Sequence, residues 1–385
     1  MFIFRLLLKN AFRHPLRTLL TIVGLVVAVV AFGMLRTIVD AWYAGAEASS
    51  STRLITRSAT SLTVPLPLAY AERLRAVDGV DGISWSNWFG GVYVSERNFF
   101  PQFAVDPQSY LPLYPEFVVK ADDRVAWERD RKGVIVGRKL ADKFGWQVGD
   151  QIPLRGTIYP GTWSFTLRGI YDGADAGTDT NQMLMHWAYL NETMRARSGR
   201  RADQVGVFIV GIRDPNNAAL VSQRIDAQFR NSLAETLTET EKAFQLGFVA
   251  MSEAILVALQ AVSFIVIVII MAVMANTMTM TARERLAEYA TLKALGFPPE
   301  FVVRLLFGES LFIALLGGVL GLLLTLPLAA LFAGATGTLF PVFRVSGATM
   351  GLQLAVALAV GAVAAAWPAW KMSRINIVNG LRHVA

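Results

Sequence analysis

The chain has 385 residues, of which 54% are hydrophobic and 17% are charged, and it carries a formal net charge of +7. Soluble globular proteins contain about 25% charged residues, so this composition indicates membrane-spanning segments joined to a soluble part. The lack of cysteine excludes disulfides, thiolate metal sites and a cysteine nucleophile. No basic run is interleaved with aromatic residues, and we therefore assign the positive charge to the flanks of membrane spans, with no nucleic acid as a partner.

The first predicted membrane span covers residues 18–43. Residues 1–17 are basic and amphipathic, and we expect them to form a helix at the cytosolic surface of the lipid bilayer. The run Thr18–Leu35 has no charged residue and is long enough to cross about 30 Å of hydrocarbon, with Trp42 and Tyr43 as anchors at the far interface. That run is too long for the apolar part of a signal peptide, and we interpret it as a span.

Residues 44–246 are expected to form a soluble α+β domain. A helix at 68–77 followed by a strand at 80–85, and a strand at 205–212 followed by a second helix, are typical of the two halves of a split ferredoxin-like (porter) unit. The strand-rich and turn-rich stretch between the halves, at about 87–202, is interpreted as an insert. The domain is large enough to bury a core of its own.

A polar segment at 232–244 leads from this domain into the next apolar run. It contains neither Gly nor Pro, and we interpret it as a helical stalk that is continuous with the following span. A polar linker is the alternative interpretation.

Three further spans are predicted at 247–282, 301–332 and 348–370. A short charged helix at 283–300 connects the first two of these spans, and a short outer loop at 333–347 connects the last two. A tail at 371–385 follows the last span. Lys and Arg concentrate before the first span, in the charged helix and in the tail. By the positive-inside rule both termini and the charged helix are cytosolic, and the α+β domain is outside.

The predicted spans contain few polar features. Glu253 is the one acid that we place near a span, and no charge pair of the kind used by ion-coupled transporters is evident. Small residues at a spacing of four allow close helix approach, either inside the chain or at a dimer seam, and the sequence leaves both open. They are Gly24 and Ala28, Gly317 and Gly321, and Ala357 and Gly361.

The sequence offers no constellation for catalysis, for a cofactor or for a metal. The three histidines, His14, His186 and His383, fall on both sides of the membrane and cannot form one site. An acidic turn lacks the EF-hand spacing and its closing Glu, so we favour a solvated loop over a calcium site; its acids are Asp172, Asp175 and Asp179. No glycine-rich phosphate loop ending in Lys-Ser/Thr occurs, which implies that any nucleotide is bound by another chain.

The charged helix at 283–300 cannot lie in lipid, because basic and acidic residues crowd its first turns. Gly296 follows its last apolar residue, and Pro298 and Pro299 prevent it from continuing. We interpret this helix as a connection to a cytosolic partner, with an ordinary solvated or interfacial helix as the alternative.

Four sequence blocks, in the order span, large outer domain, three spans, resemble the MacB/FtsX-like permeases, the membrane subunits of type VII ABC transporters. The blocks are Lys9–Arg13 with Leu16–Thr21 and Gly24; Val134–Gly137 with Leu140–Gly145 and Val148–Asp150; Glu284-Arg285-x-x-Glu288 with Lys293–Gly296 and Glu309; and Pro368-Ala369 with Ser373–Ile375 and Leu381-Arg382. The chain departs from the family pattern at Ala287, Ala290 and Asn376-Ile377.

The resemblance implies a membrane protein with four transmembrane helices and an α+β extracytoplasmic domain in the bacterial inner membrane. It implies a second permease copy, like or unlike, and a separate ATPase subunit that binds ATP and Mg, with a periplasmic adaptor and an outer-membrane duct as further candidate partners. Movement of the ATPase would pass through the membrane helices to the outer domain, which would export or extract a substrate. A LolC/LolE-type permease for lipoproteins or lipids, and an FtsX-like signal transmitter that transports nothing, are the alternatives.

The resemblance also implies that the charged helix couples the permease to the ATPase. The expected coupling residues are Glu284, Arg285, Glu288, Tyr289, Leu292, Lys293, Leu295 and Gly296. On a helical wheel, one side carries Glu284, Glu288 and Leu292, and the other carries Tyr289 and Lys293. We favour the first side as the one that contacts the ATPase.

Overall fold

The computed structural model describes residues 13–175, 177–197, 199, 201–336, 340 and 342–375, and its backbone divides into two units. A helical unit holds residues 1–40, 253–335 and 343–385, and an α/β unit holds residues 41–252 and 336–342. The expected N-terminal helix falls mostly outside the described residues, as do His383 and most of the expected tail.

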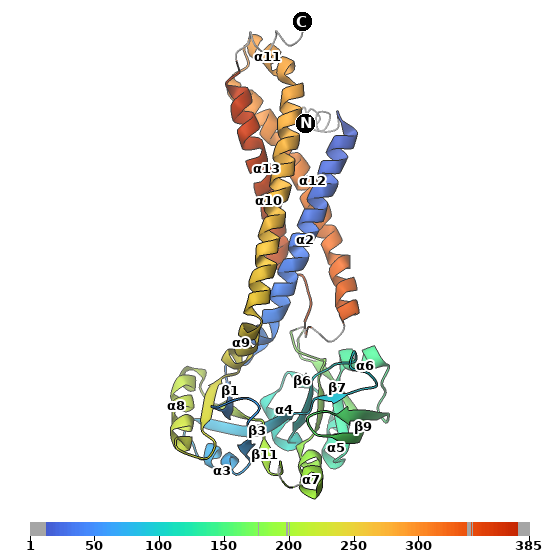
Figure 1. The fold of residues 1–385 in the computed structure, drawn as a ribbon, viewed down its shortest axis with the longest axis vertical. Coiled ribbons are helices and arrows are strands. Elements are labelled where there is room, and N and C mark those ends of the chain that lie inside the picture. Colours follow the sequence, from blue (N-terminus) through green and yellow to red (C-terminus); the bar gives the residue numbers. More distant parts are fainter. Residues whose placement is uncertain are drawn as a thin grey trace. The chain divides into compact units, whose positions relative to one another are not determined.

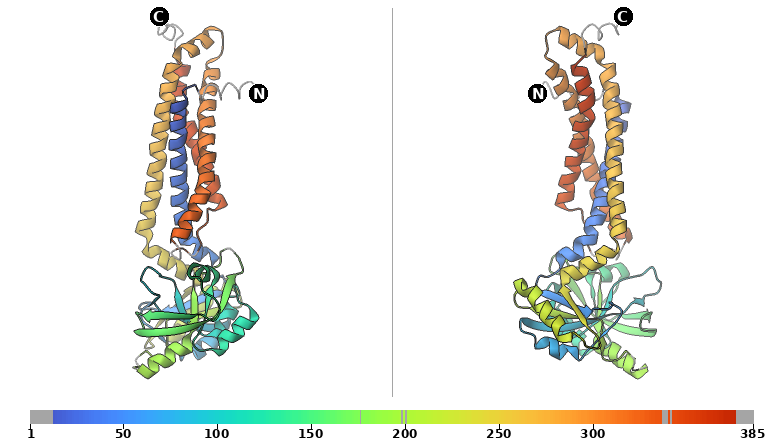
Figure 2. Two further views of the ribbon diagram at one scale, coloured as in Figure 1. Left: turned by 90° about the vertical axis from the view of Figure 1, so that its right-hand side faces the viewer. Right: turned by 60° about the vertical axis from the view of Figure 1, so that its left-hand side comes forward.

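Four helices are long and apolar enough to cross a membrane among the described residues: α2 (Pro15–Ala48), α10 (Glu253–Glu284), α12 (Pro299–Thr336) and α13 (Gly347–Ser373). They run along one another in the views of Figure 1 and Figure 2. Helices α2, α12 and α13 are longer than the predicted spans, whereas α10 begins at Glu253 and not at residue 247. Helix α2 continues through Asp40 to Ala48 without a break. The four-helix prediction is confirmed.

Glycines at four-residue spacing allow the helices of this unit to pack closely. A Cβ at Gly317 would lie 2.7 Å from the Leu25 side chain of α2, and one at Gly361 would lie 2.6 Å from Ala314 of α12. Both distances are shorter than real Cβ contacts, so a larger residue would force the helices apart. The sequence left open packing inside the chain and a dimer seam. The contacts of these two glycines support packing inside the chain.

The α/β unit is built on a ferredoxin-like core. Its strands β13 (Thr236–Thr240), β1 (Arg53–Ser58), β12 (Val207–Ile212) and β3 (Val80–Trp88) are neighbours in that order, and each adjacent pair is antiparallel. Helix α3 (Tyr70–Arg75) connects β1 to β3, and α8 (Ala218–Phe229) connects β12 to β13. This is the strand order of two interlocked split βαβ units, as predicted.

The predicted helical stalk at 232–244 is wrong. Residues 236–240 form β13, which pairs with β1 from Leu54↔Thr240 to Ser58↔Thr236, and a helix, α9 (Glu241–Met251), begins only after it. Every second residue from Thr236 is a threonine, which is a β-branched residue at the period of a strand. The Thr238 hydroxyl is 3.0 Å from that of Thr56 across the pair, so the polar residues serve the sheet.

The insert extends the same sheet instead of forming a separate one. Beyond β3 the strand order is β5-β10-β7-β9-β8-β4, with β10 parallel to β5 and β7 parallel to β9. The remaining elements of the unit are β2 (Leu66–Pro67), β4 (Gly91–Val92), β5 (Gln102–Val105), α4 (Pro107–Leu113), β6 (Phe117–Val118), α5 (Ala121–Arg129), β7 (Gly133–Gly137), α6 (Arg138–Phe144), β8 (Gln151–Gly156), β9 (Gly161–Gly173), β10 (Met183–His186), α7 (Trp187–Arg197), β11 (Gln204–Val205) and η1 (Pro215–Asn217).

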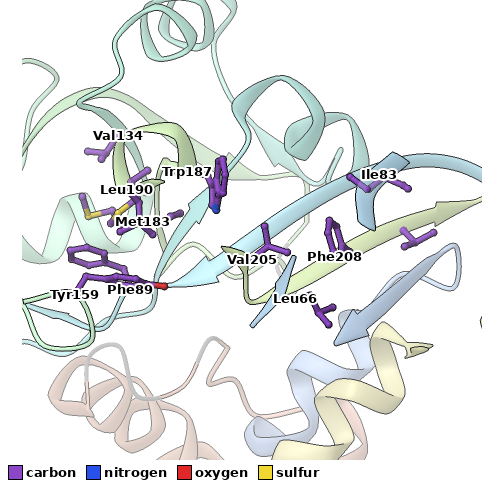
Figure 3. Close-up of a cluster of buried hydrophobic side chains, with 14 of the residues drawn as sticks. Leu66, Ile83, Phe89, Val134, Tyr159, Met183, Trp187, Leu190, Val205 and Phe208 are labelled. Carbon is purple, nitrogen blue, oxygen red and sulfur yellow. The ribbon is translucent and has the colours of Figure 1, made fainter. Parts of the chain in front are cut away.

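Two apolar clusters cover the two faces of this sheet. Successive residues of β1 point to opposite faces, so Leu54 belongs to one cluster and Ile55 to the other. The larger cluster joins the ferredoxin-like core to the insert, as Figure 3 shows for Phe208 and Val205 on one side and Val134 and Met183 on the other. The two parts therefore share one continuous core.

Candidate functional site

The charged helix α11 (Leu286–Ala294) lies between the ends of α10 and α12 (Figure 1). Its end is fixed by Gly296, whose φ of 91° is in the left-handed region that glycine tolerates. The Phe297 N–H donates to the Leu292 carbonyl and the Gly296 N–H to the Lys293 carbonyl, each at 3.1 Å. These two bonds make a Schellman motif, which stops the helix as the sequence predicted.

One side of α11 is buried against the membrane-length helices. Tyr289 and Ala290 are each 2% exposed, and Leu286 and Leu292 pack at the edge of the same cluster. The other members come from α10, α12 and α13: Ala282, Val302, Leu305, Leu306, Ala369 and Met372. The apolar side of the helix therefore joins three helices.

A buried ion pair links the start of α11 to α12. The Arg285 Nη1 donates to Glu309 Oε2 at 2.9 Å, and the side chains are 9% and 3% exposed. The Arg285 Nε also donates to Glu288 at 3.0 Å. The expectation that Glu253 is the one acid near a span is therefore wrong, because Glu309 immediately precedes the uncharged run of α12 and is buried by its neighbours.

Glu284, the last residue of α10, and Glu288 of α11 pair with basic residues at or just before the start of α2. Arg17 donates two hydrogen bonds to Glu284, at 2.7 and 2.8 Å, and Arg13 donates to Glu288. Partial burial raises the pKa of the Glu288 carboxyl, but the hydrogen bonds from Arg13 and Arg285 outweigh it and hold that pKa below its usual value. These two carboxylates thus connect α10 and α11 to α2.

Lys293 connects α11 to the end of α13. Its Nζ donates to the carbonyl oxygens of Met372, Ser373 and Ile375, at 3.3, 2.7 and 3.0 Å. The last carbonyls of a helix have no partner within the helix, and a lysine is a favourable donor to them. Burial lowers the pKa of the Lys293 ammonium.

The segment ends in an exposed apolar tip, which we define as residues 294–298. Leu295 is 72% exposed and Phe297 is 43% exposed. Of the residues expected to couple, Leu295 and Gly296 belong to this tip, whereas the favoured side of Glu284, Glu288 and Leu292 contacts other helices of the same unit. The sequence missed this division because the partners of the acids, Arg13 and Arg17, are about 270 residues away along the chain.

The acidic turn of the α/β unit has structural partners. Arg138 donates two hydrogen bonds to Asp172, at 2.9 and 3.0 Å, and the Gly177 N–H donates to Asp175 at 2.8 Å. Asp179 accepts from the Asn181 N–H at 2.8 Å. Across the described residues, no three acids, histidines or cysteines come together as metal ligands would.

Two family models match the chain. The model described as MacB-like periplasmic core domain matches residues 18–228, and the model described as FtsX-like permease C-terminal matches residues 261–377. The second match covers the helices α10 to α13 and with them the charged helix α11.

Curated relatives match the chain at low identity. An uncharacterized ABC transporter permease protein of Mycobacterium tuberculosis is 30% identical over 192 residues, which are 50% of this chain and 21% of that protein. An uncharacterized ABC transporter permease of Methanocaldococcus jannaschii is 22% identical over 397 residues, covering 97% of this chain and 96% of that protein. Thus the chain spans about a fifth of the first relative's length and nearly all of the second's.

Among solved structures, the periplasmic region of MacB from Actinobacillus actinomycetemcomitans aligns with this chain at a TM-score of 0.38 and 7% identity. The alignment covers 51% of this chain and 92% of that one.

Proposed function

This chain belongs to the MacB/FtsX-like family of ABC transporter permeases, and we propose that it carries ATP-driven movement from an ATPase to its own α/β unit. Membership of the family implies an ATPase partner in general and a membrane protein with a domain outside the membrane. The proposal adds that the ATPase is a separate subunit that binds ATP and Mg, and that it acts on α11.

The observation that carries the proposal is the combination of a fixed helix and an exposed tip. Helix α11 is attached to α12 by the buried Arg285–Glu309 pair and to α13 by three hydrogen bonds from Lys293. A force on its end would therefore move both membrane-length helices together. The tip exposes Leu295 and Phe297, and apolar side chains of this kind anchor protein contacts when a partner's pocket encloses them.

We propose the following orientation and assembly. The tip and both termini are cytosolic, because basic residues flank that end of the spans, and the α/β unit is in the periplasm of a bacterium with an inner membrane. Two permeases and two ATPase subunits form the machine, which exports or extracts a substrate on the periplasmic side. A periplasmic adaptor and an outer-membrane duct are the partners expected of an exporter.

Co-purification with the ATPase tests the contact. The tagged chain would be isolated from its native host, and its partners identified by mass spectrometry. Leu295→Asp together with Phe297→Asp is expected to remove the ATPase from the complex, because two charges would replace the apolar anchors. Val94→Asp is the matched control, since Val94 is an apolar residue of the α/β unit that is 82% exposed.

Retention of the ATPase by the doubly substituted tip would contradict the proposed contact. The other partners separate the alternatives: an adaptor and a duct support export, and a cell-wall hydrolase supports signalling. A topology reporter at Gly296 is expected to be cytosolic and one at Gly177 external, and the reverse result at either position would overturn the orientation.

A further inference from the structure

A buried charged cluster lies beside two of the segments that connect the α/β unit to the helical unit, the turn after α2 and helix α9, which we call the two connections. Arg53 is the first residue of β1, which follows α2 in the chain, and Glu241 is the first residue of α9, which precedes α10. The two strands that lead to this point, β1 and β13, are paired neighbours, with Leu54 opposite Thr240. The function proposed for α11 does not depend on this cluster.

Arg53 binds one connection and the insert at the same time. Its side chain is 5% exposed, and its Nε donates to Glu241 Oε2 at 2.8 Å. The two Nη atoms donate to Glu116 of the insert at 3.0 and 2.5 Å, and Nη1 also donates to the Leu113 carbonyl at 2.8 Å. One guanidinium thus joins α9 to the loop between α4 and β6.

The second connection is bound through Glu241. The Ser50 N–H, in the turn that follows α2, donates to Glu241 Oε2 at 3.1 Å. The Tyr114 hydroxyl donates to Glu241 Oε1 at 3.1 Å. The 6% exposed side chain of Glu241 therefore accepts from the end of one connection, the start of β1 and the insert.

A row of packed rings continues from the cluster into the insert. The Arg53 guanidinium lies 4.1 Å from the ring centroid of Tyr114, which is stacked on Phe117 at 5.4 Å. Phe117 is 4.8 Å from Tyr171, whose hydroxyl donates to the Asp179 carbonyl at 3.1 Å. The contacts are continuous from the two connections to the loop that follows β9.

This arrangement costs free energy that a purely structural contact does not require. Buried ion pairs contribute little net stability compared with well-packed apolar residues, whereas their geometry is specific. The fork of an arginine fits carboxylates in one orientation and holds several at fixed angles. Such a residue is suited to hold three segments in fixed positions relative to one another while they move.

We propose that Arg53 is a positioning residue that makes the insert follow the movement of the two connections. The inference rests on the proposed transmission of movement. When α9 and the end of α2 shift, Glu241 and Ser50 carry Arg53 with them, and Glu116 and Tyr114 pull the insert in the same direction. Without the joint, the movement of the two connections would not reach the insert, and the insert would keep its distance from α8 of the ferredoxin-like core.

Spin labels in the full-length chain test the joint. The sequence contains no cysteine, so Ser164→Cys in β9 and Gln223→Cys in α8, both exposed, would be the only labelled positions. The distance between the two labels would be measured in lipid nanodiscs, together with the ATPase that co-purifies with the chain, before and after addition of ATP. We expect ATP to shift this distance in the otherwise unchanged chain.

Arg53→Lys, Glu241→Gln and Glu116→Gln are each expected to abolish the ATP-driven shift and to broaden the distance distribution without ATP. The ATPase should remain bound and the tip contact intact. Arg138→Lys is the matched control, because Arg138 also binds a carboxylate through two bonds in the same unit but is 43% exposed. It should leave the shift unchanged.

A shift that persists in both Arg53→Lys and Glu116→Gln would overturn the inference. Glu116→Gln keeps the test decisive if Arg53→Lys does not fold, because the Glu116 side chain is 26% exposed and Arg53 retains Glu241. If ATP moves nothing in the unchanged chain, the proposed function fails instead. The distance distributions measured without ATP then test the role of Arg53. Broader distributions in the variants support that role, and unchanged distributions refute it.

Discussion

Two arginines are buried among the described residues, one in each unit, and the clusters around them differ in what surrounds the acids. The Glu309 side chain is 3% exposed and accepts a hydrogen bond from Arg285, whereas Glu241 accepts from Arg53, Tyr114 and the Ser50 N–H. The first cluster therefore depends on one arginine. In the second, two neutral donors bind Glu241 beside the Arg53 guanidinium, which suits a joint between moving segments.

The comparison predicts the largest loss for Arg285→Met. Glu309 would keep its charge in a buried site without its arginine, and breaking a buried pair in this way costs about 3–5 kcal/mol in the free energy of unfolding. The measurement is denaturant unfolding of the detergent-solubilised chain, followed by circular dichroism. Arg285→Met combined with Glu309→Leu should recover most of the loss, since no unpaired charge remains. Equal losses in the single and double variants would contradict this account.

Arg53→Met is expected to cost less, about 1.5–3 kcal/mol, which is the range for hydrogen bonds to charged groups. Glu241 would retain two donors, and Glu116 would gain solvent because its side chain is already 26% exposed. Hydrogen exchange of the α/β unit in the intact chain would measure the loss. Arg138→Met serves as the exposed control, with an expected effect below about 1 kcal/mol. If Arg53→Met lowered the free energy of unfolding more than Arg285→Met does, the expected order of the two clusters would be contradicted.

The smallest effect concerns pH. The pKa of Glu288 is lower in the folded chain than its ordinary value of 4.5. Its contribution to stability is therefore complete above that value and is lost as the pH falls through the lower, folded pKa. Unfolding measured between neutral and acidic pH should show a smaller decline for Glu288→Gln than for the unchanged chain. Identical pH profiles would show that the pairing with Arg13 and Arg285 does not matter for stability.

Much of the fold could be predicted because its signals are local. The long uncharged runs predict the membrane-length helices, and the Gly296-Phe297-Pro298 end of α11 predicts a helix stop with its Schellman bonds. The strand β13 was missed although its alternating threonines were visible, since the lack of Gly and Pro in that segment favoured a helix. Only pairing with β1 decides such a segment, because strand formation depends on the neighbour across the sheet.

By itself, the sequence determined the four apolar helices, the split ferredoxin-like core and the family, since each depends on composition, period or a short motif. Only the tertiary structure decided which residues of α11 are buried and that Glu309 and Arg53 lie in buried charge clusters. Burial and pairing depend on residues far apart in the chain, as with Arg17 and Glu284 or Arg53 and Glu241. No local pattern records which distant side chains folding will bring into contact.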